Sequence, residues 1–203
     1  MDSNLIITIG RQLGSGGGKI AKLLAEEFNC KLYDRELLNL AARESGYSEE
    51  IFEQNDEHKN FLSAIGSTIF SSRSTLFPLR NADQEVSLFQ LQSDAILNAA
   101  AKGNCVFVGR CADYILREQS NVVSVFITAP LEQRLERVMK RHECDQRKAQ
   151  KILSSKESQR ADYYNFYTGK RWGAAESYDL CIDSSILGIE QTARFIADFI
   201  RKR

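Results

Sequence analysis

The sequence predicts an α/β fold with a parallel, doubly wound sheet, in a single domain covering residues 1–203. Apolar segments typical of buried strands alternate with helical patterns along the chain, which is the element order of such sheets. Most of these segments are continuous apolar runs, as in strands that are covered on both faces. In addition, five of the twelve glycines fall between positions 10 and 18, directly after the first strand segment. Together these observations favour a sheet that carries a ligand-binding turn.

Five segments are predicted to be strands, the fifth shorter than the others. They lie at 5–9, 30–33, 105–108, 122–127 and 180–182. Helical patterns separate them, at 20–28, 35–43, 84–101, 131–142, 147–166 and 189–201. Because each strand is followed by a helical stretch, the strands can run parallel to one another.

Two stretches do not fit this alternation. Residues 48–80 predict an inserted helical piece that caps one end of the sheet, and the apolar residues of 61–80 either pack internally or form a partner surface, such as a homodimer contact. Residues 143–173 predict a charged helix that ends in aromatic residues and forms a lid, since lids in such folds connect two core elements. The core is then formed by residues 1–47, 81–142 and 174–203.

Composition sets limits on the function. The chain has 203 residues, of which 43% are hydrophobic and 27% charged, as in an ordinary globular protein. Lysine plus arginine and aspartate plus glutamate each number 27, so no global field favours nucleic acid or a membrane, and an anion site must be built locally. No signal peptide or membrane span is evident, and the five cysteines form no C-x-x-C pair, which favours a reducing, cytoplasmic location.

The glycine-rich turn is predicted to bind nucleotide phosphates. Glycine permits positive φ and a close approach of the backbone, so that successive N–H groups can converge on an anion. The following helix adds the positive end of its dipole. A strand, a glycine turn and a helix in this order are typical of P-loop proteins. The predicted phosphate ligands are the amides of Gly14, Ser15, Gly16, Gly17 and Gly18.

The turn departs from the usual G-x-x-x-x-G-K-[ST] pattern. Read onto Gly18 and Lys19, that pattern requires glycine at 13 and a hydroxyl at 20, where the chain has Leu13 and Ile20. Either Lys19 supplies the phosphate charge from an altered loop, or it already lies on the helix and points outward. In the second case Arg11 is the nearest replacement, because its planar fork suits phosphate. Ser15 is the hydroxyl in the turn that could assist Mg²⁺.

Several segments, in order along the chain, resemble cytidylate kinases. Residues 19–34 are similar to the segment of these enzymes that leads from the loop to the second strand. Gly109 and Arg110 match the end of their third strand, and Tyr163-Tyr164 matches a motif of a divergent cytidylate-kinase-like group. The turn Arg11–Gly17, the segments 126–130 and 179–190 and the arginines at 134, 137 and 141 also resemble this group.

This resemblance implies a P-loop NTPase type of fold, with a five-stranded parallel sheet of order 2-3-1-4-5, a helical acceptor-site insertion and a lid. It also implies an ATP- and Mg²⁺-dependent phosphotransferase that moves the γ-phosphate to a nucleoside monophosphate or a similar small acceptor. Gly17 and Lys19 stand where the enzymes have lysine and threonine, and Cys111 replaces an aspartate that helps to read cytosine. The alternative is therefore a weakly active or inactive nucleotide-binding sensor or regulator of the same fold.

The acceptor site is predicted at the carboxyl ends of the strands, where α/β sheets bind ligands. Arginines closing over the transferred phosphoryl group are expected on the helix at 131–142, at spacings of three and four, and on the lid. Exposed ion pairs are the alternative for Arg35 and Arg110, and a solvated face is the alternative for the three helix arginines. The predicted acceptor residues are Asp34, Arg35, Arg110 and Asp113, and the catalytic residues are Arg11, Lys19, Arg134, Arg137, Arg141 and Arg160.

Overall fold

The computed structural model describes residues 4–34 and 82–203. The chain divides into two units, one formed by residues 1–35 and 96–203 and the other by residues 36–95. The first unit contains the sheet and the glycine turn, and helix α5 (Ala82–Lys102) spans the boundary between the two units. The helix expected at 35–43, the insertion at 48–80 with the apolar segment 61–80, and Arg35 lie outside the described residues.

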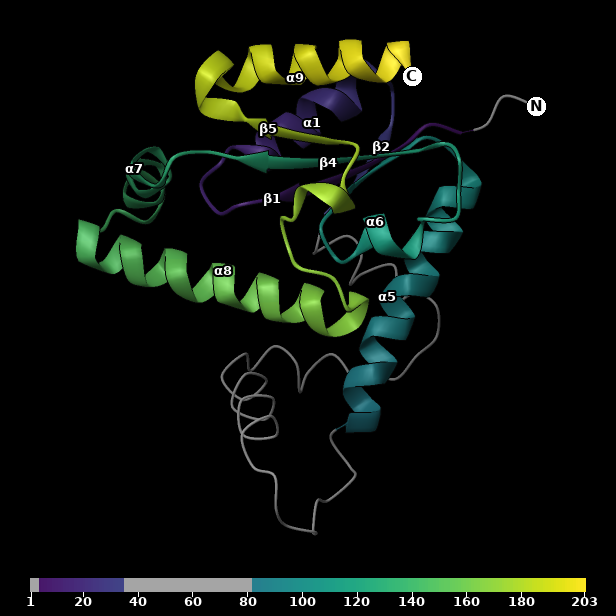
Figure 1. The fold of residues 1–203 in the computed structure, drawn as a ribbon, viewed down its shortest axis with the longest axis horizontal. Coiled ribbons are helices and arrows are strands. Elements are labelled where there is room, and N and C mark those ends of the chain that lie inside the picture. The colour runs from purple at the N-terminus through teal and green to yellow at the C-terminus, as the bar shows by residue number, and fades with distance from the viewer. Residues whose placement is uncertain (1–3, 35–81) are drawn as a thin grey trace, which may run out of the picture. The chain divides into compact units, whose positions relative to one another are not determined.

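Five parallel strands form one sheet in the order β2-β3-β1-β4-β5 (Figure 1). Both the parallel pairing and this order agree with the sequence prediction. Strand β1 is central and pairs with β3 on one side and β4 on the other, with Ile6 opposite Cys105 and Val122. The strands are β1 (Ile6–Arg11), β2 (Lys31–Tyr33), β3 (Cys105–Val108), β4 (Val122–Thr128) and β5 (Leu180–Asp183).

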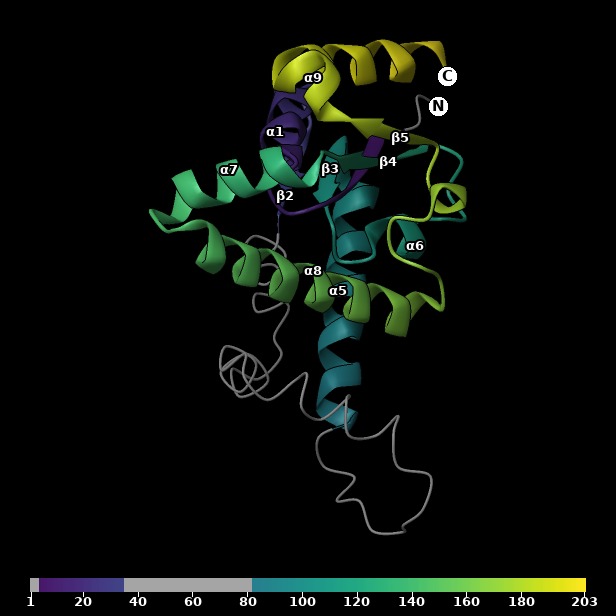
Figure 2. The same ribbon diagram turned by 60° about the vertical axis from the view of Figure 1, so that its left-hand side comes forward.

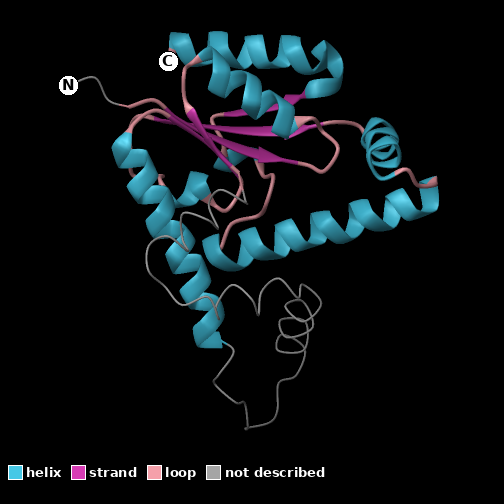
Figure 3. Cartoon of the chain, turned by 180° about the vertical axis from the view of Figure 1, so that it is seen from behind, coloured by secondary structure: helices cyan, strands magenta, loops and turns pink. Residues whose placement is uncertain are grey.

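Helices α1 (Gly17–Glu27) and α9 (Ser184–Lys202) lie together on one face of the sheet, whereas α6 (Ala112–Ile115) and α8 (Gln146–Thr168) lie on the other (Figures 1 and 3). The face under α1 and α9 carries β-branched side chains from the three central strands, and residues such as Ile7, Ile127 and Ile196 are fully buried there. Since successive residues of a strand point to opposite faces, the continuous apolar runs of the sequence serve both layers.

Helix α7 (Leu131–His142) packs against α8 through a separate small core that includes Leu135, Val138 and Leu153 (Figure 2). At the other end of α8, the following loop is anchored to the sheet by aromatic contacts. Trp172 meets the ring of Phe126 edge-on at 5.4 Å between centroids, and Tyr178 lies 4.9 Å from the same ring. Helix α8 is thereby held at both ends, on α7 and on β4.

Most expected boundaries agree with the structure to within two residues, but the starts of two helices differ by more and one short helix was not expected. Helix α1 begins at Gly17, three residues before the predicted start, because Gly16 takes the left-handed conformation that turns the chain into the helix. Helix α9 begins at Ser184, capped by the Asp183 carboxylate, and the predicted helix is the part after the break at Gly188. The short helix α6 was not predicted. Among the described helices, none is long and apolar enough to cross a membrane.

Candidate nucleotide-binding site

The glycine turn joins β1 to α1 and is held rigidly from several sides. Gly14 and Gly16 have φ of 78° and 83°, a conformation that non-glycine residues rarely adopt. A Cβ on Gly14 would also lie 2.7 Å from the backbone oxygen of Arg134 on α7, so the turn packs directly against that helix. The Ser184 hydroxyl at the start of α9 donates to the Ser15 carbonyl at 2.6 Å. The turn is therefore preformed.

Backbone amides of this turn are available to a ligand. Between Gly14 and Gly18, the N–H groups of the four glycines donate no hydrogen bond to any part of the chain that the structure describes. The first amides of any helix are free, but here the turn adds those of Gly14 and Gly16. A concave row of free amides at a helix N-terminus is a phosphate-binding arrangement.

The side chains of Ser15 and Lys19 lie in different surroundings, the first buried and the second exposed. The Ser15 side chain is fully buried, and its hydroxyl donates to the Gln12 carbonyl at 2.9 Å, so the structure gives it a partner inside the turn. This orientation does not fit a magnesium ligand. Lys19 lies in the first turn of α1 with an exposed side chain, beside the fully buried Ile20. An exposed side chain agrees with the outward-pointing alternative for Lys19, and the identity of the cation of the turn stays a prediction.

Three arginines meet where β1, β3 and α8 come together. Arg11 is the last residue of β1, and its backbone oxygen accepts a hydrogen bond of 3.1 Å from Nη1 of Arg160. Arg110 follows β3 with a φ of 59°, which directs its guanidinium over the ring of Tyr163, 5.2 Å from the centroid. We call the group formed by Arg11, Arg110 and Arg160 the strand-end cluster.

Among the described residues, the carboxylates of Asp34 and Glu157 offset the positive charge of the strand-end cluster only in part. Burial, together with the charges of Arg160 and Arg110, lowers the pKa of Arg11 to about 9, and Asp34 opposes this shift. Burial also lowers the pKa of Arg160, against the effect of Glu157 and with that of Arg110. A guanidinium whose neighbours disfavour its charge is stabilised when an anion binds. The strand-end cluster therefore has the electrostatic character of an anion site.

The three arginines of α7 do not act as one face. Arg134 is buried, and its guanidinium contacts the carboxylate of Glu157 at 2.7 Å and the carbonyl of Ala129 at 2.9 Å. Arg137 is half-buried and donates to the Gly14 carbonyl at 2.9 Å. Arg141 is exposed on the last turn of the helix. Only Arg137 thus reaches the glycine turn with its side chain.

The acceptor candidates are placed in different surroundings. Asp34 directly follows β2, is exposed, and acts electrostatically on Arg11. Asp113 on α6 is engaged by α8, because the Tyr164 hydroxyl donates to its carboxylate at 2.7 Å. Burial raises the pKa of Asp113, against that hydrogen bond. The Asp113 carboxylate therefore joins α6 to α8, which the sequence prediction of a substrate contact did not foresee.

Sequence reasoning missed one residue of the site, Glu157. The same carboxylate oxygen accepts from the Leu13 amide at 3.2 Å and from Arg134 at 2.7 Å, so Glu157 fastens α8 to the glycine turn and to α7 at once. The sequence signal was its spacing of three residues from Arg160, which places the two side chains on one side of α8. That signal does not show which distant segments the side chain would join.

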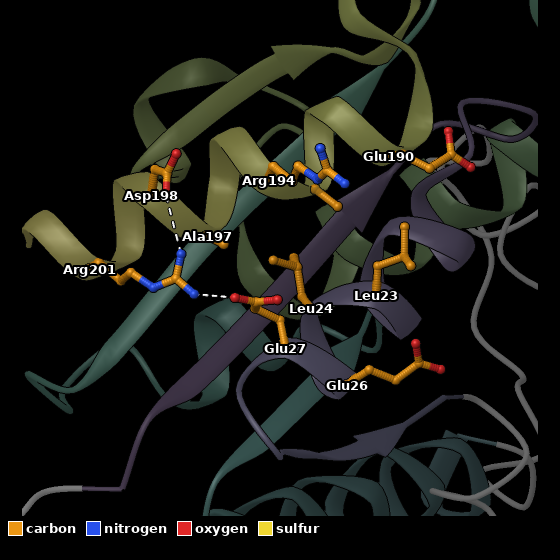
Figure 4. Close-up of a pocket in the computed structure, with 10 residues that line it drawn as sticks. Leu23, Leu24, Glu26, Glu27, Glu190, Arg194, Ala197, Asp198 and Arg201 are labelled. Atoms are coloured by element: carbon orange, nitrogen blue, oxygen red, sulfur yellow. Dashed lines mark hydrogen bonds and ion pairs between the residues drawn. The ribbon is translucent and has the colours of Figure 1, made fainter.

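A hollow lies along the C-terminal half of α1, between this helix and α9 and apart from the glycine turn (Figure 4). Its volume is about 630 Å³, and its floor includes Leu24 and Ala197. At its rim, Arg201 forms ion pairs with Glu27 and with Asp198. These charges are satisfied locally, unlike those of the strand-end cluster, and we assign no ligand to this groove.

A five-stranded parallel sheet of this order, with a glycine nest between its central strand and the next helix, defines an α/β protein of the P-loop class. The model of the cytidylate kinase-like family matches residues 6–186, and the chain belongs to this family. Solved structures agree on the fold. An uncharacterised protein of Eubacterium ventriosum superposes with a TM-score of 0.75 at 29% identity, over 98% of this chain and 100% of that one. Shikimate kinase of Bacteroides thetaiotaomicron superposes with a TM-score of 0.56 at 12% identity, over 97% of this chain and 98% of that one, which shows the fold alone.

Two curated relatives carry the name cytidylate kinase. The protein of Methanocaldococcus jannaschii is 26% identical over 200 residues, which cover 97% of each chain. That of Pyrococcus horikoshii is 29% identical over 183 residues, which cover 89% of this chain and 80% of the relative. The family and the fold together support a nucleotide kinase.

Proposed function

We propose that this protein is a nucleotide kinase that binds ATP at the glycine turn and transfers its γ-phosphate to a nucleoside monophosphate. One observation carries the proposal: the turn with its free amides contacts Arg11 of the strand-end cluster, whose charges the described carboxylates offset only in part. A triphosphate on the amides and an acceptor phosphate between the arginines would supply negative charge where these arginines lie close together.

In the proposed reaction, an oxygen of the acceptor phosphate forms a bond to the γ-phosphorus while the bond from that phosphorus to the β,γ-bridging oxygen breaks, and ADP leaves with the electron pair. Such a transfer depends on position and on charge neutralisation. The amides of Gly14–Gly18 hold the donor, while Arg110 and Arg160 align the acceptor and stabilise the charge between the two groups. Mg²⁺ is held in phosphotransferases mainly by phosphates and water, so it would enter with ATP.

The acceptor is proposed to be a pyrimidine nucleoside monophosphate. The names of the curated relatives support this proposal. The buried Cys111 stands where the resemblance expects an aspartate that reads cytosine, and the Asp113 carboxylate is engaged by Tyr164. Discrimination between CMP and UMP is therefore expected to be weak.

A coupled assay of ADP formation with Mg²⁺-ATP and CMP, dCMP, UMP or AMP tests the proposal. We expect turnover that requires an acceptor, is higher with CMP, dCMP and UMP than with AMP, and differs little between CMP and UMP. The Arg160→Ala variant should lose most of this turnover, while Arg194→Ala, on the far helix α9, should match the wild type. Absence of turnover with every acceptor would overturn the proposed kinase activity.

A nucleotide-binding protein without transfer activity is the second candidate. It is favoured by the two side chains of the loop that usually assist catalysis, because the Ser15 hydroxyl is engaged by the Gln12 carbonyl and the Lys19 side chain is exposed. Calorimetry separates the two candidates. Tight ATP binding combined with no turnover would support the sensor, whereas binding with acceptor-dependent turnover would exclude it.

A further inference from the structure

Gly17 is a glycine for a reason that its own backbone does not explain. It begins α1 and is absent from the residues with positive φ, so any residue could adopt its conformation. However, a Cβ at position 17 would lie 2.6 Å from Cβ and 2.9 Å from Cγ of Arg11. Real Cβ atoms do not approach other carbons this closely. The Arg11 side chain therefore fills the space into which a side chain at 17 would project.

Beyond this contact, the Arg11 side chain continues to the end of β3. A Cβ on Gly109 would overlap Nη1 of Arg11, so the guanidinium lies directly against the Gly109 backbone. Arg11 thus passes between two glycines, Gly17 at its stem and Gly109 at its head. Along this path the Arg11 side chain leads from the glycine turn to the other two arginines of the strand-end cluster.

We propose that Arg11 provides the phosphate-binding cation of this loop, in place of a lysine at position 17. The space between positions 11 and 17 accommodates a long cationic side chain from only one of them. The inference rests on the proposed nucleotide site and names the residue that completes it. In P-loops the lysine follows the glycine-rich stretch and reaches the β- and γ-phosphates. Here the cation comes from the other end of the turn, from the last residue of β1.

The other cations near the turn are less suited to this role. Lys19 is exposed on the outer side of α1. Arg137 already donates to the Gly14 carbonyl, on the side of the turn that faces α7. The Arg11 guanidinium instead lies near Arg110 and Arg160, whose charges act on it, and an anion there would reduce the repulsion among all three.

Moving the cation from position 11 to position 17 tests the proposal. The variants are Arg11→Gly, Gly17→Lys and the double variant, and the ligands are ATP and inorganic tripolyphosphate, measured by calorimetry. Arg11→Gly should bind both ligands about 10- to 100-fold more weakly, as expected for the loss of a charge-assisted contact. The double variant removes the Arg11 stem, so a lysine at 17 fits. This variant should bind both ligands at least about tenfold more tightly than Arg11→Gly.

Steric exclusion is tested separately, without nucleotide, by thermal unfolding. Gly17→Ala should lower the melting temperature in the wild-type background but not in the Arg11→Gly background, because only the former contains the colliding side chain. Arg11→Met keeps the stem of the side chain without its charge. It should match the melting temperature of the wild type more closely than Arg11→Gly, yet bind the two ligands as weakly.

The outcomes separate this inference from the proposed function. Wild-type protein that binds neither ligand would overturn both. Wild-type binding that Arg11→Gly and Arg11→Met retain would overturn the role of Arg11 and leave the kinase proposal standing. Two results would overturn the inference that a cation at position 17 can replace the one at position 11. One is a folded double variant that binds no better than Arg11→Gly, and the other is an equal effect of Gly17→Ala on the melting temperature in both backgrounds.

Discussion

Arg134 and the strand-end cluster both lie at helix α8, yet they differ in how their positive charge is compensated. Arg134 is buried with Glu157 at 2.7 Å and a carbonyl at 2.9 Å, so its charge is neutralised inside the protein. In the strand-end cluster, Arg160 donates to the Arg11 carbonyl, but burial and the charge of Arg110 lower the pKa of both Arg11 and Arg160. Arg134 is also the more buried of the two, since the three arginines of the strand-end cluster are half-buried.

The difference shows how the same residue type can serve stability in one place and binding in another. A buried charge with a matched partner fixes the packing of the elements that carry the two side chains. A buried charge without a matched partner lowers stability until an anion binds, and binding then adds to stability. The Arg134–Glu157 pair is therefore expected to hold the turn in place, and the strand-end cluster is expected to hold a phosphate.

The largest effect is expected from removing Arg134. Arg134→Ala leaves the Glu157 carboxylate with the Leu13 amide but without its ion-pair partner, so the free energy of unfolding should fall by about 3 kcal/mol. Urea unfolding measures the change. The double variant Arg134→Met, Glu157→Gln keeps an acceptor for Leu13 without either charge and should recover part of the loss. Unchanged stability of Arg134→Ala would show that the pair is not structural.

Arg160→Ala should give the opposite pattern. It removes one hydrogen bond to Arg11 but also a repulsive charge, so the free energy of unfolding should change little. Affinity for tripolyphosphate should fall by about tenfold at low salt, and the difference should shrink as salt screens the charges. Calorimetry at two salt concentrations measures both effects. A large loss of stability with normal affinity would make Arg160 a structural residue like Arg134.

A smaller effect is expected at Asp113, the acid that joins α6 to α8. Burial raises its pKa above the usual 3.8, so the folded protein holds this proton more tightly than the unfolded chain. The stability gained from protonation is fully present below that usual value and is lost as the pH rises through the raised pKa. Asp113→Asn cannot titrate and still accepts from Tyr164.

The stability of Asp113→Asn relative to the wild type should therefore increase as the pH is raised from about 4 to about 7. Thermal unfolding of the two proteins across this range provides the test. A difference that stays constant with pH would mean that Asp113 has the same pKa in the folded and unfolded chains. The result would show whether the Asp113 carboxylate, at the contact between α6 and α8, is a buried charge without full compensation, as in the strand-end cluster.

The smallest effect is expected from Arg201→Ala on the groove between α1 and α9. Arg201 pairs with Glu27 and Asp198, but all three side chains are largely exposed. Exposed ion pairs contribute little, because water and salt screen them. The melting temperature should not change measurably, in contrast to Arg134→Ala. A loss as large as that of Arg134→Ala would mean that exposure does not separate structural from incidental pairs in this protein.

Much of the fold could be predicted from the sequence, because strands and helices in such sheets leave local patterns. The apolar runs gave the strands, and the glycines between 10 and 18 predicted the turn whose free amides the structure contains. Spacing on α7 was less informative. It placed Arg134, Arg137 and Arg141 on neighbouring positions, but their surroundings depend on α8 and on the turn, which are distant in the sequence.

The sequence by itself determined the sheet, its parallel strands and the position of the glycine turn, because hydrophobic period and glycine content act locally. It also left two candidates, Arg11 and Lys19, for the cation of that turn. Only the tertiary structure decided where each side chain goes: the start of α1 directs Lys19 outward, and the space beside Gly17 and Gly109 receives Arg11. Such a choice depends on atoms brought together from β1, β3 and α1, and no pattern within one segment contains that information.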